Sequence, residues 1–86
     1  MQSQDILQAL YESEINCRFE SFWDNGWIGW LGDGMNGYHF HRVRGETFAD
    51  CVLNLADQAC SVYPESAFAE RYGARRQGRL LGANDG

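Results

Sequence analysis

The segment FWDNGWIGWLGDGMNGY, residues 22–38, contains all three tryptophans and five of the ten glycines of this 86-residue chain. Asparagine and glycine tolerate positive φ angles, so Asp24-Asn25-Gly26 and the glycine-rich run 32–37 each predict a turn. The apolar residues 27–31 between the two turns then form the middle strand of a small sheet. Because both connections are short, we expect an antiparallel meander of three strands.

The strands on either side are predicted from alternating apolar and polar residues. Residues 15–20 have the period of a half-buried strand, with Ile15, Cys17 and Phe19 facing inward. We place the third strand over 38–43. For the second and third strands, our assignment turns Trp27, Leu31, Tyr38 and Phe40 toward the helices and leaves Ile28, Trp30, His39 and His41, with Phe22 and Val43, on the outer face.

Helices are predicted before and after these strands. Apolar residues at helical spacing indicate a first helix that is capped by Ser3 and ends near Ser13 or Glu14. Thr47, with Asp50 three residues later, resembles a capping box at the start of a second helix over 48–63. Pro64 ends that helix because it cannot continue the hydrogen-bond ladder.

These elements define the fold that we expect. Residues 65–72 should form one more short helix, which Gly73 ends. The fold class is α+β in the order α-β-β-β-α, a three-stranded antiparallel meander sheet with helices packed on one face. We predict a single domain over residues 1–73 and a flexible, arginine-containing tail over 74–86.

The charge of the chain is uneven. Residues 1–70 carry three arginines and eleven acidic residues, whereas residues 71–86 carry four arginines and one aspartate. The net charge is −5, and no lysine is present. Phosphate backbones need a positive surface, so an acidic body disfavours direct binding to nucleic acid. It is compatible with binding to a basic groove on another protein.

Localisation and cysteine chemistry follow from the same composition. No apolar run approaches the roughly 18 residues that a membrane span needs, and the N-terminus lacks the features of a signal peptide. We therefore expect a location in the bacterial cytoplasm and no membrane partner. Cys17, Cys51 and Cys60 are odd in number and form no Cys-x-x-Cys pair, so we expect buried free thiols and no cofactor.

Two motifs with known chemistry have simpler interpretations. Residues 32–37 match G-x-G-x-x-G, but dinucleotide binding requires a helix after the motif, and here a strand is predicted. His39 and His41 share one side of a predicted strand and could ligate a metal, although no third ligand is evident. Surface histidines and a glycine-rich hairpin turn explain both patterns.

Several short motifs resemble a set of small bacterial and prophage proteins. They are residues 10–16, 22–26, 31–33, 36–37, 47–49 and 63–66, and the likeness extends over residues 5–70. Most of these positions are turn glycines, caps and core aromatics, so the resemblance implies a shared fold. Because such proteins often travel on phage genomes, it also implies an inhibitor of host defence similar to anti-CRISPR proteins.

The combined hypothesis is a non-enzymatic, phage-borne interaction protein that inhibits a bacterial nucleic-acid-handling defence complex by occupying its basic surface. The predicted partner-binding residues are Glu12, Glu14, Glu20, Asp24 and Asp33, with Ile28 and Trp30 as apolar anchors. A first alternative is a homodimeric structural or accessory protein that pairs through its outer sheet face. A second alternative is a small metal-binding or enzymatic domain that uses His39 and His41.

Overall fold

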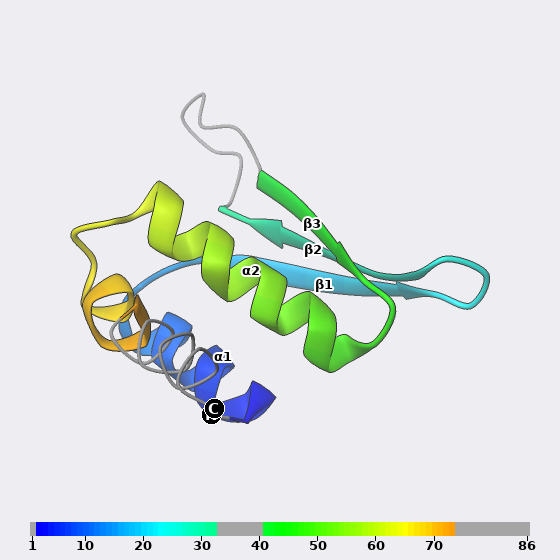
Figure 1. Ribbon diagram of the computed structural model, residues 1–86, viewed down its shortest axis with the longest axis horizontal. Coiled ribbons are helices and arrows are strands. Elements are labelled where there is room, and N and C mark those ends of the chain that lie inside the picture. Colours follow the sequence, from blue (N-terminus) through cyan, green and yellow to red (C-terminus); the bar gives the residue numbers. More distant parts are fainter. Residues whose placement is uncertain (1, 33–40, 74–86) are drawn as a thin grey trace, which may run out of the picture.

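The computed structural model describes residues 2–32 and 41–73 (Figure 1). The elements follow in the order α1 (Ser3–Glu12), β1 (Cys17–Phe22), β2 (Gly26–Leu31), β3 (His41–Gly45) and α2 (Phe48–Val62), and residues 67–73 are helical. The strands form one antiparallel sheet in the order β1-β2-β3. This confirms the α+β prediction. Residues 38–40 of the predicted third strand, His39 and the predicted tail 74–86 lie outside the described residues.

The sheet register decides which side chains share a face. Leu31 of β2 pairs with Cys17 of β1 and with His41 of β3, and residues directly opposite one another point to the same side. Leu31 has no exposed surface, so this row lies under the helices. The covered face therefore holds Cys17, Phe19, Ser21, Trp27, Gly29, Leu31, His41, Val43 and Gly45. The inward assignment of Trp27 and Leu31 is confirmed.

The predicted phase of the third strand was wrong. His41 lies on the covered face, where its Nδ1 is 3.4 Å from Nε2 of Gln58 on α2. Val43 also packs against the core and does not reach the outer face. Arg42 and Arg44 take the outer positions instead. This arrangement keeps two guanidinium groups in water and puts the more apolar residues of β3 beneath the helix.

Helix α2 lies directly on β2 and β3, and two glycines permit the close approach. A Cβ atom at Gly45 would lie 2.7 Å from the Cα of Cys51 and would overlap the backbone nitrogen of that residue. A Cβ at Gly29 would lie 3.0 Å from Leu55 and 3.2 Å from the Cys51 sulfur. The helix starts where the sequence predicted, because Thr47 Oγ1 accepts a hydrogen bond of 3.1 Å from the Asp50 amide.

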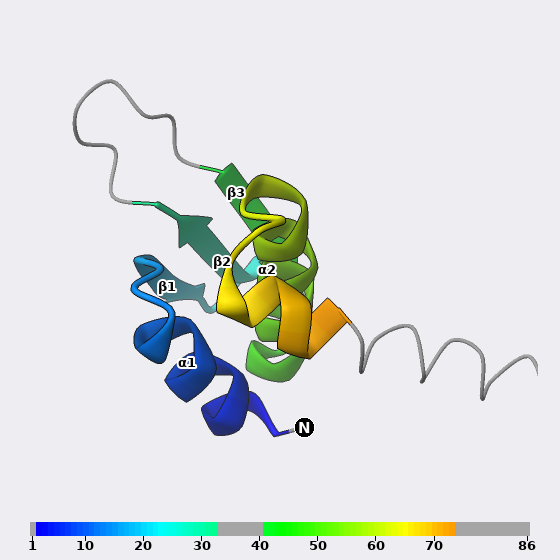
Figure 2. The same ribbon diagram turned by 90° about the vertical axis from the view of Figure 1, so that its left-hand side faces the viewer.

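The core forms where α1, α2 and the helical segment 67–73 meet the covered face. Figure 2 shows these helices on the same side of the strands. Helix α1 begins after Gln2, whose amide donates to Asp5 Oδ2 at 3.1 Å, so Ser3 is its first residue rather than its cap. Burying these apolar side chains is the main stabilising contribution to the fold. The largest fully buried side chains are Ile6, Leu10, Leu31, Cys51, Val52, Leu55 and Phe68.

Candidate interaction surface

No described helix covers the second face of the sheet, which we call the open sheet face. Its residues are the alternate positions of the three strands and lie in two cross-strand rows. The first row is Arg18, Trp30 and Arg42, and the second is Glu20, Ile28 and Arg44, with Phe22 at the end of β1. Ile28 and Trp30 therefore lie on the outer face, as predicted. The same face also carries three arginines.

The arginines of the open sheet face differ in their contacts. The Arg18 guanidinium carbon lies 4.7 Å from the ring centroid of Trp30, and Arg18 Nε is 3.6 Å from Glu20 Oε1. Arg44 Nη2 donates to the backbone carbonyl of Asn25 at 3.1 Å and also to the Asn25 side chain. Within the described ranges, no ion pair or hydrogen bond involves the Arg42 side chain. Among the arginines of this face, Arg42 is thus the one whose guanidinium is available to an anionic group.

Charge is divided between the two sides of the molecule. Three of the four arginines described are on the open sheet face, together with one acidic residue, Glu20. The rest of the described chain carries Arg71 and nine acidic residues. The open sheet face is therefore locally positive on a protein whose net charge is −5. Over distances shorter than the Debye length of about 8 Å at physiological salt, a binding partner responds to this local charge.

The turn between β1 and β2 presents the most exposed aromatic side chain in the described residues. Trp23 is 98% exposed, and the neighbouring Phe22 is 38% exposed. The turn closes with a 3.0 Å hydrogen bond from the Asn25 amide to the Phe22 carbonyl. Gly26 follows at φ +81°, where any Cβ would lie 2.7 Å from the Gly45 carbonyl. We call residues 22–26 the hairpin tip.

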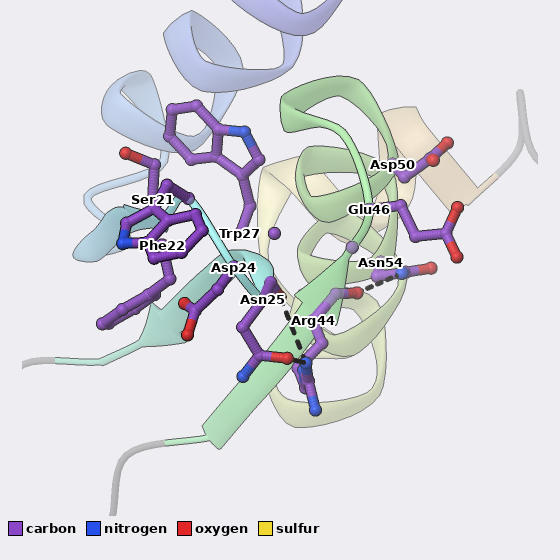
Figure 3. A pocket seen from close by; sticks show the side chains of 12 residues that line it. Ser21, Phe22, Asp24, Asn25, Trp27, Arg44, Glu46, Asp50 and Asn54 are labelled. Carbon is purple, nitrogen blue, oxygen red and sulfur yellow. Dashed lines mark hydrogen bonds between the residues drawn. The ribbon is translucent and has the colours of Figure 1, made fainter.

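The hairpin tip borders an open hollow of about 1030 Å³ (Figure 3). One wall is the hairpin tip, and the other is the junction between β3 and α2. Arg44 forms hydrogen bonds to both walls. The Arg44 carbonyl accepts a 2.6 Å hydrogen bond from Asn54 of α2, while its guanidinium holds Asn25. Asp24 lies on one side of the hollow, and Glu46 and Asp50 lie on the other. Indole and carboxylate groups are therefore gathered at this end of the sheet.

The predicted acidic residues do not form one cluster. Glu12 and Glu14 precede β1 and Asp24 follows it, so a strand of six residues, about 20 Å long, lies between them. Glu20 is on the open sheet face next to Arg18, and Asp33 lies outside the described residues. Of the predicted acidic residues that the structure describes, Asp24 alone adjoins the hollow. Glu46 and Asp50, which the sequence did not single out for binding, line it together with Asp24.

Trp23 was not recognised as a candidate from the sequence. A signal was present, because Trp23 directly precedes Asp24-Asn25-Gly26. A side chain at the start of a tight hairpin turn extends beyond the sheet and has few neighbours to pack against. The anchor that was predicted, Trp30, is instead half-buried beneath the Arg18 side chain.

Among the described residues, neither His41 nor the cysteines are arranged as a nucleophilic or metal-binding site, and His39 lies outside that range. Cys17 of β1 and His41 of β3 share the covered face, but β2 lies between their strands and Leu31 lies between the two residues. The two strands are therefore about 10 Å apart. Burial raises the pKa of the Cys17 and Cys51 thiols, which favours the unreactive protonated form. Within residues 2–32 and 41–73, no three His, Cys, Asp or Glu side chains are grouped as metal ligands.

Comparison with other proteins adds no identity. The sequence matches no family model, and the comparisons with curated proteins and with solved structures give no match either. Among the described helices, none is both long enough and apolar enough to cross a bilayer. Any functional argument for this chain therefore depends on its own surface chemistry.

Proposed function

We propose that this chain is a non-enzymatic interaction protein that binds a basic surface of a protein partner through its hairpin tip. The observation that carries the proposal is Trp23, 98% exposed beside a hollow lined by Asp24, Glu46 and Asp50. Tryptophan is enriched among the residues that dominate binding energy at interfaces. Leaving this side chain in water is unfavourable, and a partner that buries it recovers that free energy.

The charge around Trp23 favours a basic partner. Three carboxylates and one arginine line the hollow, and the Arg44 guanidinium is already held by Asn25. A cation on the partner gains both carboxylate contacts and the face of an indole ring. Basic grooves are typical of nucleic-acid-handling complexes. The concrete form of the proposal is a phage-borne inhibitor of a bacterial defence complex, similar to anti-CRISPR proteins.

The test is affinity capture from a bacterial lysate that contains CRISPR effector complexes, at low and at high salt. The wild-type protein should retain a nucleic-acid-binding complex, and Trp23→Ser should weaken its binding by about 30-fold, the size of a hot-spot contact. Tyr11→Ser is the matched control, because Tyr11 is a 78% exposed aromatic residue on α1, away from the tip.

Charge is tested separately in the same assay. Reversing Asp24 and Glu46 to arginine should reduce capture and should also reduce its salt dependence. Reversing Glu65 and Glu70, which are exposed and do not line the hollow, changes the net charge equally and should have little effect. If Trp23→Ser binds the complex as tightly as the wild type, the hairpin tip is not the binding site.

A further inference from the structure

The open sheet face presents a second binding surface of opposite charge. It combines Trp30 and Ile28 with three arginines, whereas the hollow at the hairpin tip is lined by three carboxylates. Arg42 is exposed and uncompensated among the described residues, and Trp23 is almost fully exposed. One copy of the chain therefore leaves two groups for a second copy to contact. They are Arg42, which lies beside Trp30, and Trp23, which lies beside the carboxylates of the hollow.

The hairpin tip and the Arg18, Trp30 and Arg42 row of the open sheet face are at opposite ends of the sheet. The row of Arg18, Trp30 and Arg42 lies six residues from Asp24 along β1, about 20 Å. Two sheets that face each other with antiparallel strands bring the tip of each copy to the arginine row of the other. A reciprocal arrangement of this kind is an isologous contact with two-fold symmetry.

We propose that two copies of this chain associate in this way, with the hairpin tip of each copy against the open sheet face of the other. Trp23 then lies over the Arg42 side, and Asp24 supplies the carboxylate for the Arg42 guanidinium. Stacking the two open faces without the tips would leave three arginines and one glutamate on each side, so like charges would meet. The Asp24 carboxylate that each tip adds reduces that repulsion.

The contact regulates the binding site proposed above, and in that respect it rests on the proposed function. The paired form covers Trp23, so pairing and partner binding exclude each other. A basic partner surface displaces the second copy by offering cations to the same carboxylates. The association itself is measured without any partner.

Sedimentation equilibrium of the purified full chain tests the pairing, because salt acts in opposite directions on the two kinds of association. Copies that carry a net charge of −5 and meet through unspecific contacts repel one another, so added salt strengthens their association. Tip-to-face pairing is attractive and should weaken about tenfold between about 0.05 M and 0.3 M salt. A monomer at all concentrations and salts, or association that strengthens with salt, overturns the proposal.

A charge exchange identifies the contact. Arg42→Glu puts a carboxylate opposite Asp24, and Asp24→Arg puts a guanidinium opposite Arg42, so each variant alone should be monomeric. Mixed together, the two variants form one pair in which both contacts are again attractive, and dimer mass should return. Dimers of either variant alone, or a mixture that stays monomeric, would contradict the assigned contact.

Matched controls separate this result from the loss of the fold and from the loss of the partner site. Glu65→Arg and Arg71→Glu make the same charge changes at exposed positions outside both surfaces, and these variants should pair as the wild type does. Circular dichroism confirms that each variant is folded. Arg42→Glu should still capture the basic partner through its intact tip, so failure of pairing and failure of the proposed function give different results.

Discussion

The two faces of one three-stranded sheet differ in almost every physical property. On the covered face, Gly29 and Gly45 let α2 approach within van der Waals contact, and Leu31 has no exposed surface. On the open face, the intervening positions carry arginines, and Trp30 is only half-buried. Because successive residues of a strand point to opposite sides, covered and exposed side chains alternate along the same segments. Changes on the covered face should therefore affect folding, and changes on the open face should affect association.

The largest effect on folding should come from Gly45→Ala. The new methyl group would lie 2.7 Å from the Cα of Cys51. Because the atoms that collide belong to β3 and to the backbone of α2, only a movement of the backbone can relieve the contact. Overpacking of this kind costs about 3 kcal/mol of unfolding free energy. Urea denaturation measures the loss.

Gly73→Ala is the matched control. A Cβ at Gly73 meets nothing within 4 Å, and the residue lies in the helical segment 67–73. Alanine there should leave the stability unchanged or raise it by about 0.5 kcal/mol. Equal stability of the Gly45→Ala and Gly73→Ala proteins would show that α2 does not press on β3 as described.

A smaller difference is expected between two aliphatic residues on opposite sides of β2. Leu31→Ala removes a fully buried side chain and should cost about 3 kcal/mol, including the cavity that it leaves. Ile28→Ala, on the open sheet face, should cost about 1 kcal/mol because that side chain is already partly in water. Thermal unfolding of both variants checks the ranking, and a larger loss for Ile28 would mean that the open face is covered.

The smallest effect concerns pH and the thiol beneath α2. Burial raises the pKa of the Cys51 thiol above its usual 9.0, so the native state retains its proton after the unfolded state has released it. This contribution to stability is complete below pH 9.0 and is lost as the pH rises through the higher native value. Cys51→Ala should make the alkaline decline in unfolding free energy shallower, which denaturation at several pH values will reveal. An unchanged slope would contradict the assignment of this proton to Cys51.

Much of the fold could be predicted because its local signals agree. Thr47 and Pro64 bound α2 by capping and by ring geometry, and both effects act within a few residues. Asp24-Asn25-Gly26 set the register of β1 and β2 because a tight turn leaves little freedom. The phase of β3 was mispredicted because a long glycine-rich connection precedes it. Its register follows from packing Val43 and Gly45 under α2, a contact between distant parts of the chain.

The candidate site was harder to predict than the fold. The sequence gives the sign of the charge but not its distribution. The structure places Arg42 and Arg44 on the outer face, where His39, His41 and Val43 were expected. Glu46 and Asp50 line the same hollow as Asp24 because Arg44 connects the hairpin tip to α2. Trp30 was singled out over Trp23 because strand periodicity describes which way a side chain points and not what lies above it.

The three tryptophans occupy three different environments, and this gives the protein its own optical reporters. Trp23 is in water, Trp27 packs 4.8 Å from the Phe48 ring on the covered face, and Trp30 lies under the Arg18 guanidinium. Emission from an indole shifts to shorter wavelength when the ring leaves water. Variants that retain one tryptophan would therefore report separately on the tip, the core and the open face. A spectrometer could follow folding and binding in a single unlabelled sample.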